Sequence, residues 1–163
     1  MRRALTRSAA ILLLALATPA AGAGKADVVR WRPLEAGEAE ARKAGKPVFY
    51  FFTADWCGPC HVLVEEVFSD KKAAAAIEKR YVPVLLEDRR RQEGKNAPGM
   101  DDLVRRFGVK GFPTLIVSNP GANQGLRLTG WAGRQKTLDF IDGAAERLKK
   151  KEAEARAAEA GKP

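Results

Sequence analysis

The sequence predicts an α/β domain, and three observations indicate this fold class. Residues 48–53 form a nearly continuous apolar and aromatic run between turn-forming residues, which is typical of a strand buried on both faces. Directly after Cys60 the apolar positions change to the spacing of a helix with one apolar face. Strand-like and helix-like segments then alternate, so the expected order is β-α-β-α-β-β-α after an optional leading segment.

Glycine and proline signals set the limits of the expected elements. Gly45-Lys46-Pro47 ends the first helix before the buried strand, and Gly108 caps a short later helix. Asn119-Pro120-Gly121 is the turn of a hairpin. Pro83 indicates an edge position or an interrupted ladder for its strand, and a polar loop follows at residues 87–100. The expected helices are residues 35–44, 58–68, 71–80, 101–107 and 137–148, and the expected strands are residues 48–53, 81–86, 114–118 and 126–130.

The first 23 residues have the pattern of a secretory signal peptide. Basic residues at 1–7 precede a short apolar core at 9–17, and Ala21-Gly22-Ala23 offers a small-x-small cleavage pattern. The core is about half the ~20 residues that cross a bilayer, which argues against a membrane anchor. We therefore expect a periplasmic or secreted protein after cleavage near Ala23. The expected parts are a signal peptide at 1–23, a flexible leader at 24–30, one domain at 31–148 and a charged helical extension at 149–163.

The chain is moderately basic. Its formal charge of +9 falls by three when Arg2, Arg3 and Arg7 leave with the signal peptide. The remaining basic residues are interleaved with acidic ones and lack aromatic partners, so we expect no nucleic-acid binding. Arg89-Arg90-Arg91 lies in the polar loop and is expected either to be solvated or to recognise an acidic partner. We expect a monomer.

The chain contains two cysteines, and they stand three positions apart. In an oxidising compartment a structural disulfide usually closes a longer loop, so this pair indicates redox catalysis or cofactor attachment. Cys57 falls where a strand ends and a helix begins, and the unpaired N–H groups of a helix start stabilise a thiolate. Gly58 and Pro59 suit the first helical turn, and Cys60 is expected within disulfide reach but more buried.

Two motifs resemble the signatures of the thioredoxin family. Trp56-Cys57-Gly58-Pro59-Cys60 is similar to the thioredoxin active-site motif. Gly111-Phe112-Pro113-Thr114 is similar to the second signature, in which a cis-proline faces the dithiol. The resemblance covers about residues 31–148. The tryptophan-led start also resembles the C-terminal periplasmic domain of the DsbD thiol-disulfide reductants, as do Gly45-Lys46-Pro47-Val48, Ala54-Asp55-Trp56-Cys57 and Val67-Phe68-Ser69-Asp70.

The resemblance implies a thioredoxin fold, with a central mixed β-sheet flanked by helices, and a thiol-disulfide oxidoreductase that acts on disulfide-containing exported proteins. It implies that Cys57 attacks the substrate and that Cys60 resolves the mixed disulfide, with no cofactor beyond the redox-active Cys57–Cys60 disulfide. The Gly-Pro spacer resembles that of reductants, so we expect a reductase that a membrane thiol-disulfide electron donor keeps reduced. The residues expected to bind substrate are Trp56, Gly58, Pro59, Phe112, Pro113, Thr114 and Gly130.

The neighbourhood of the dithiol departs from the family pattern. Phe51 stands six residues before Cys57, where thioredoxins carry a buried acid thought to take the proton of the resolving thiol. The strand lysine that is common in the family has no clear counterpart. Water, Glu87 and Asp55 therefore stay open as proton acceptors. His61, the single histidine, replaces a common lysine or arginine and is expected to tune Cys57 through its charge.

Two alternatives place a metal at the cysteines. Cys57-Gly58-Pro59-Cys60-His61 satisfies the C-x-x-C-H attachment motif of c-type haem, and Met100 would then be a second axial ligand. The buried strand before the motif and the alternating β/α pattern argue against this electron-transfer function, because such cytochromes are almost all helical. Two thiols and one imidazole are too few for a closed zinc site. A copper-binding dithiol module stays open.

Overall fold

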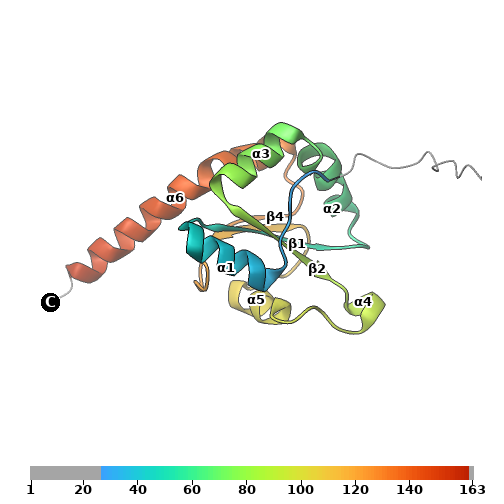
Figure 1. Ribbon diagram of the computed structural model, residues 1–163, viewed down its shortest axis with the longest axis horizontal. Coiled ribbons are helices and arrows are strands. Elements are labelled where there is room, and N and C mark those ends of the chain that lie inside the picture. The colour runs from blue at the N-terminus through green and yellow to red at the C-terminus, as the bar shows by residue number, and fades with distance from the viewer. Residues whose placement is uncertain (1–26, 162–163) are drawn as a thin grey trace, which may run out of the picture.

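The computed structural model describes residues 27–161, and the signal peptide expected at residues 1–23 lies outside them. A four-stranded sheet forms the middle of the molecule, with helices on both of its faces (Figure 1). The strand order is β2-β1-β3-β4. The strands are β1 Val48–Ala54, β2 Val82–Asp88, β3 Thr114–Ser118 and β4 Leu126–Thr129.

β1 is an inner strand, and all of its residues except Thr53 are buried. It runs parallel to β2 and antiparallel to β3, which pairs antiparallel with β4. The expected α/β architecture with a central mixed sheet is therefore confirmed. Successive strand side chains point to opposite faces, so Phe49 and Phe51 enter one core cluster while Tyr50 and Phe52 enter the other. Because both faces of β1 are covered, its apolar run is uninterrupted.

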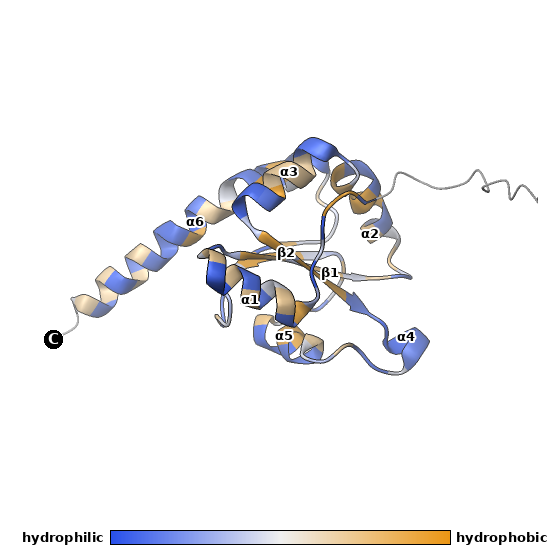
Figure 2. Cartoon of the chain, viewed as in Figure 1, coloured by the Kyte–Doolittle hydropathy of each residue, from blue (hydrophilic) through white to orange (hydrophobic). Residues whose placement is uncertain are grey.

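The helices divide between the two faces of the sheet. Their bounds are α1 Leu34–Ala44, α2 Gly58–Leu63, η1 Val64–Phe68, α3 Lys71–Arg80, α4 Arg90–Glu93, α5 Met100–Phe107 and α6 Arg134–Ala160. Residues of α2, η1, α3 and α6 pack with Phe49 and Phe51, whereas α1 and α5 pack on the opposite face (Figure 1). Figure 2 shows hydrophobic residues on the strands and a hydrophilic α4.

The helix after the cysteines begins in the Gly58-Pro59 spacer, as predicted. α2 starts at Gly58, because the Sγ atom of Cys57 accepts a hydrogen bond from the Cys60 amide and Pro59 fits the first helical turn. α2 then continues directly into the π-helical turn η1. The Asp70 side chain caps α3, so the expected interruption between these two helices is present.

β2 extends further than expected and lies at an edge of the sheet. Glu87 and Asp88 continue its parallel pairing with β1, so they belong to the strand and not to the polar loop. The remaining loop contains the short helix α4, which ends at Gly94 in a left-handed conformation. Pro83 lies in this edge strand, as its missing N–H predicts.

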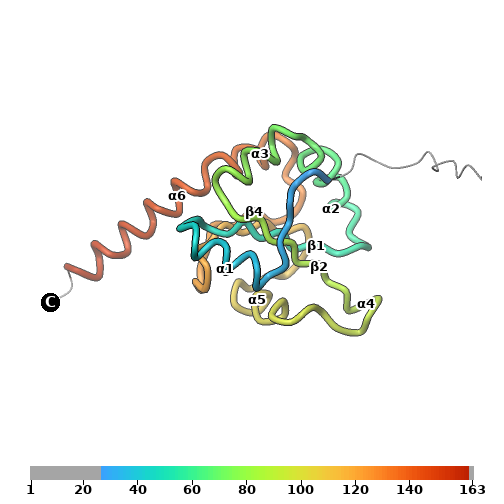
Figure 3. The backbone as a smooth tube through the Cα atoms, viewed as in Figure 1, coloured from blue at the N-terminus to red at the C-terminus, as the bar shows by residue number. Residues whose placement is uncertain are grey.

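The segment before α1 packs against the domain. The described part of the expected leader is residues 27–30, in which the Val28 amide donates to the Phe68 carbonyl at 2.9 Å and Val29 is buried. The Arg32 amide then donates to the Pro83 carbonyl at 2.9 Å. Figure 3 shows this blue segment running from beside α2 towards α1. The leader is thus a packed part of the fold over the residues that are described.

The last helix is longer than the expected core helix at 137–148. α6 runs without interruption through Ala160, so the charged extension expected at 149–163 is helical as far as that residue. Asn119, in the hairpin turn, donates a hydrogen bond to Glu152 of the extension. None of the helices between residues 27 and 161 combines the length and apolar character that crossing a membrane requires.

Candidate active site

Cys57 and Cys60 form a disulfide at the carboxyl end of β1, with their Cα atoms 5.2 Å apart. Cys57 is the N-cap residue of α2, and its Sγ atom lies 3.3 Å from the Cys60 amide. The two residues are 4% and 2% exposed, so both are buried in this oxidised form. Gly58 and Pro59 lie exposed in the first turn. The sequence prediction of a dithiol at a strand-to-helix junction is therefore confirmed.

An apolar surface flanks one side of the dithiol. Trp56 is 45% exposed, and its ring meets that of Phe112 edge-on at a centroid distance of 5.9 Å. The guanidinium carbon of Arg91 lies 4.0 Å from the centroid of the Trp56 ring. Phe112 also packs against the core cluster that contains both cysteines. The structure thus brings Trp56 and Phe112 together beside the disulfide.

The second signature forms a loop with free backbone groups. The Phe112–Pro113 peptide bond is cis, as the resemblance implies. The Pro113 carbonyl accepts a hydrogen bond from the Gly130 amide at 2.8 Å. Gly130 has a backbone φ of 75°, a conformation that favours glycine. Thr114 Oγ1 donates to the Gly111 carbonyl at 2.7 Å. Within residues 27–161 the N–H and C=O groups of Phe112 form no hydrogen bond, so they are free to pair with an added chain.

Cys60, and not Cys57, lines a pocket on the inner side of the disulfide. The pocket has a volume of about 540 Å³. The predicted tuning residues Asp55, His61 and Glu87 all lie in its wall, and so does Phe51. His61 Nε2 lies 2.7 Å from the Asp55 carbonyl oxygen, so this nitrogen carries a proton and donates. Glu87 accepts a hydrogen bond from Arg89 at 3.1 Å.

Asp27 also lines this pocket, and sequence reasoning missed it. Its carboxylate accepts hydrogen bonds from Trp31 Nε1 at 2.5 Å and from the Val29 amide at 2.9 Å. Burial raises the pKa of the Asp27 carboxyl above its usual value, although these two hydrogen bonds lower it in part. No motif marks Asp27, because it precedes Cys57 by 30 positions in a segment expected to be a leader.

The arginines of the polar loop are mostly paired with neighbouring carboxylates. Arg89 forms ion pairs with Glu87 and Glu93, at 3.1 and 2.7 Å. Arg90 pairs with Asp88 at 2.5 Å, and this hydrogen-bonded pairing lowers the pKa of the Asp88 carboxyl. Arg91 lies instead on Trp56. Of the three arginines, Arg91 is therefore the one that lies on the aromatic residue next to Cys57, while Arg89 pairs with a carboxylate of the pocket that Cys60 lines.

A family model described as a thioredoxin-like domain matches residues 34–145. The chain belongs to the thioredoxin-like family. It is a thioredoxin-like thiol-disulfide oxidoreductase, with Cys57–Cys60 as its redox-active disulfide. The thioredoxin fold predicted from the sequence is confirmed.

Two relatives are similar to this chain over half of its length or more. The chain is 32% identical over 119 residues to thiol:disulfide interchange protein DsbD 1 of Pseudomonas aeruginosa, a match that covers 72% of this chain and 18% of that protein. This chain thus spans less than a fifth of that relative. It is 30% identical over 84 residues to a thioredoxin of Thiocapsa roseopersicina, covering 50% of this chain and 76% of the relative.

Solved structures show the same fold. A thioredoxin from Thermus thermophilus superimposes with a TM-score of 0.56 at 27% identity, covering 69% of this chain and 84% of the other. The DsbH oxidoreductase superimposes with a TM-score of 0.59 at 17% identity, covering 75% of this chain and 88% of the other. The second likeness concerns the fold alone.

The haem alternative does not fit this thioredoxin-like fold. Met100, its expected second axial ligand, is 1% exposed in the core cluster with Tyr50 and Phe52. Cys57 and Cys60 belong to the cluster on the opposite face of the sheet. Within residues 27–161 no three His, Cys, Asp or Glu side chains gather as a metal-ligand set. Copper binding would therefore depend on the two thiols of the reduced protein.

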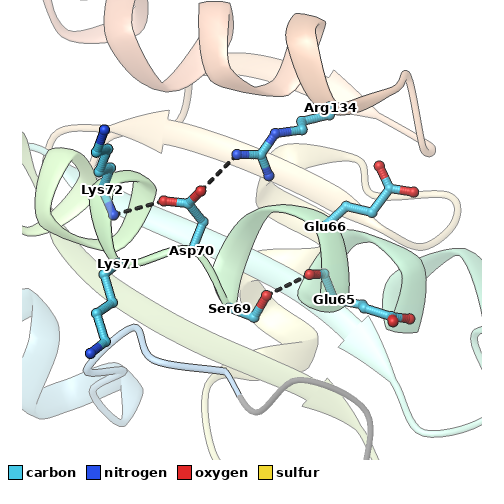
Figure 4. A pocket seen from close by; sticks show the side chains of 7 residues that line it. All are labelled: Glu65, Glu66, Ser69, Asp70, Lys71, Lys72 and Arg134. Atoms are coloured by element: carbon cyan, nitrogen blue, oxygen red, sulfur yellow. Dashed lines mark hydrogen bonds and ion pairs between the residues drawn. The ribbon is translucent and has the colours of Figure 1, made fainter.

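A larger pocket of about 700 Å³ lies between η1, α3 and α6 and includes neither cysteine (Figure 4). Asp70 links two elements of its wall, because its carboxylate accepts a hydrogen bond from the Lys72 amide of α3 at 2.7 Å and pairs with Arg134 of α6 at 2.7 Å. The hydrogen bond from Arg134 is the main cause that lowers the pKa of the Asp70 carboxyl. Figure 4 shows these bonds linking the starts of α3 and α6, so the pocket marks a structural junction.

Proposed function

We propose that this thioredoxin-like protein reduces disulfides in exported proteins, with Cys57 as nucleophile and Cys60 as resolving thiol. The observation that carries the proposal is the unequal environment of the two sulfurs. Cys57 caps α2 directly after Trp56, whose ring meets the ring of Phe112. Cys60 faces the inner pocket. A substrate chain therefore has a surface on the side of Cys57, while Cys60 reacts from within.

The first chemical step uses the thiolate of Cys57. Helix N–H groups favour the charged form of this sulfur, which attacks one sulfur of a substrate disulfide. A mixed disulfide forms, and the other substrate sulfur leaves with the electron pair and takes up a proton. Trp56 and Phe112 cover apolar parts of the substrate, and Phe112 pairs its free N–H and C=O with the substrate backbone. Gly58, Pro59, Pro113, Thr114 and Gly130 form the remaining walls of this proposed binding surface.

The second step closes the observed disulfide. Cys60 loses its proton and attacks Cys57 Sγ, so the bond between Cys57 and the substrate sulfur breaks. The substrate sulfur leaves as a thiolate and takes up a proton. The substrate has then gained two electrons and two protons, and the protein holds the Cys57–Cys60 disulfide. A membrane thiol-disulfide donor would return the electrons in the proposed cycle.

The direction and compartment rest on sequence features. The Gly58-Pro59 spacer resembles that of reductants, with a potential near about −270 mV against about −120 mV for the strongest oxidant. Residues 1–23 have the pattern of a signal peptide, which supports a periplasmic or secreted protein. The similarity to a protein named for thiol:disulfide interchange supports exchange partners of the same chemical kind.

The reduction potential of the purified mature protein tests the direction. The protein is equilibrated with glutathione or dithiothreitol buffers, and the fraction of Cys57–Cys60 disulfide is measured. We expect a value near about −270 mV, whereas a value between about −180 and −120 mV would indicate an oxidase or isomerase. A visible spectrum of the same sample tests for haem. Tight copper binding without reduction of any protein disulfide would favour the copper alternative.

A further inference from the structure

The inner pocket contains a carboxylate whose position the aromatic core fixes. Asp27 is held through both oxygens, by Trp31 Nε1 and by the Val29 amide. The Trp31 ring lies 5.6 Å from the ring of Phe51 and 5.2 Å from that of Phe68, centroid to centroid. Trp31 therefore connects the hydrophobic core to the carboxylate of Asp27 at the wall of the pocket.

Phe51 lines the same pocket and stands where the family has a buried acid. A phenyl ring exchanges no proton. Phe51, Cys60 and Asp27 line the same pocket. The aromatic residue that replaces the acid thus packs against the tryptophan that holds another acid in the wall of the pocket that Cys60 lines.

The other titratable side chains on the pocket are differently placed. Glu87 is paired with Arg89 of the polar loop, at 3.1 Å. His61 donates to the Asp55 carbonyl. The side chains of Asp55, His61 and Glu65 are exposed to bulk water. Among the carboxylates of this pocket, Asp27 is the one that accepts hydrogen bonds through both of its oxygens, from the Val29 amide and from Trp31 Nε1.

We propose that Asp27 is the proton acceptor for the resolving thiol Cys60, in place of the absent strand acid. The inference rests on the proposed exchange reaction. In the mixed disulfide, the Cys60 thiol passes its proton through pocket water to the Asp27 carboxylate. The Cys60 thiolate then attacks Cys57 Sγ, and the substrate sulfur leaves with the electron pair. Asp27 afterwards releases the proton to solvent through the pocket.

Two further observations agree with this role. Burial raises the pKa of Asp27, which brings its proton affinity closer to that of a thiol and improves it as a base. The cleavage expected near Ala23 lies before Asp27, so the mature chain keeps this residue.

The test separates the two steps in one reaction. Reduced mature protein is mixed in a stopped-flow instrument with an aryl disulfide that releases a coloured thiolate at each step. The first phase reports attack by Cys57 and depends on reagent concentration. The second phase reports attack by Cys60 within the protein and does not. Both rates are measured against pH for the wild type, Asp27→Asn, Asp27→Glu, Glu87→Gln and Glu66→Gln.

We expect Asp27→Asn to slow the second phase at neutral pH at least about 10-fold. A general base typically contributes more than this, but water would take over part of the role in the variant. The first phase should stay unchanged, and the slowed second phase should recover as pH rises and Cys60 ionises directly. Asp27→Glu should restore part of the rate. Glu66→Gln is the control for removal of a carboxylate near the site, since Glu66 lies in η1 and lines the other pocket, and it should match the wild type (Figure 4).

Three outcomes would overturn the assignment of Asp27. In the first outcome, Asp27→Asn leaves the rate and the pH profile of the second phase at their wild-type values. The second is slowing by Glu87→Gln alone, which would make Glu87 the acceptor. The third is equal slowing of both phases with an unchanged pH profile, because that indicates only a structural role. A wild type that reduces no protein disulfide would instead contradict the proposed function, while the two phases with the aryl disulfide would still report on Asp27.

Discussion

The two sides of the disulfide follow the family to different degrees. On the side of Cys57, the motif residues Trp56, Phe112 and Pro113 lie where their resemblance to thioredoxins implies. On the side of Cys60, the strand acid is absent, and Phe51 lines a pocket to which the segment before α1 contributes Asp27. The comparison teaches that a short motif fixes the proposed substrate-binding surface. The environment of Cys60 depends instead on segments that are distant in sequence.

Replacing each cysteine separately is the strongest way to test this asymmetry. We expect Cys60→Ser to accumulate mixed disulfides with substrate proteins, because the first step proceeds and the resolving thiol is missing. Cys57→Ser should trap none and should lose turnover completely. The measurement is a non-reducing gel of acid-quenched reactions, with the double variant as control. Equal trapping by both single variants would contradict the assignment of the two roles.

The apolar surface beside Cys57 is tested by Trp56→Ala and Phe112→Ala. Each variant loses the edge-on aromatic pair, and Trp56→Ala also removes exposed apolar area. We expect kcat/KM for a protein disulfide to fall about 10-fold, which corresponds to about 1.4 kcal/mol of lost contact with the substrate. The rate with the small aryl disulfide should stay near the wild-type value, since that reagent does not need the surface. A similar loss with both substrates would indicate that the variants disturb the dithiol itself.

The sequence predicted the features that depend on neighbouring residues. The uninterrupted run in β1 identified a strand covered on both faces, and Pro83 identified an edge strand. The cysteine spacing and the Phe112-Pro113 signature identified the dithiol and the cis bond beside it. The features it missed depend on long-range contacts. β2 continues to Asp88 because β1 continues beside it, and Asp27 reaches the pocket because Trp31 packs on core aromatics.

The pH dependence of stability gives a separate measure of the environment of Asp27. Its pKa is raised in the folded protein, so ionisation is less favourable there than in the unfolded chain. The wild type therefore loses stability as pH rises from the pKa of Asp27 in the unfolded chain, about 3.9, through its higher pKa in the folded protein. Asp27→Asn lacks this loss. We expect its melting temperature relative to wild type to increase between about pH 4 and about pH 7.

The direction of that change distinguishes Asp27 from carboxylates that are ion-paired. The pKa of Asp70 is lowered, chiefly by the hydrogen bond from Arg134, so its contribution is present at neutral pH and is lost as pH falls. Asp70→Asn should therefore lower the melting temperature relative to wild type more at neutral pH than near about pH 4. Equal slopes for the two variants would show that Asp27 is not in a desolvated environment.

The smallest effect is expected at the end of α6, which lies far in sequence from both sides of the disulfide. Glu152 contacts Asn119, whereas every residue from Ala153 to Ala160 is exposed. Ending the chain after Glu152 removes no buried contact, so the melting temperature should change by no more than about 2 °C. The reduction potential and both phases with the aryl disulfide should match the full chain. Ending it before Leu148, which is 8% exposed, should lower the melting temperature clearly because that cut opens the core.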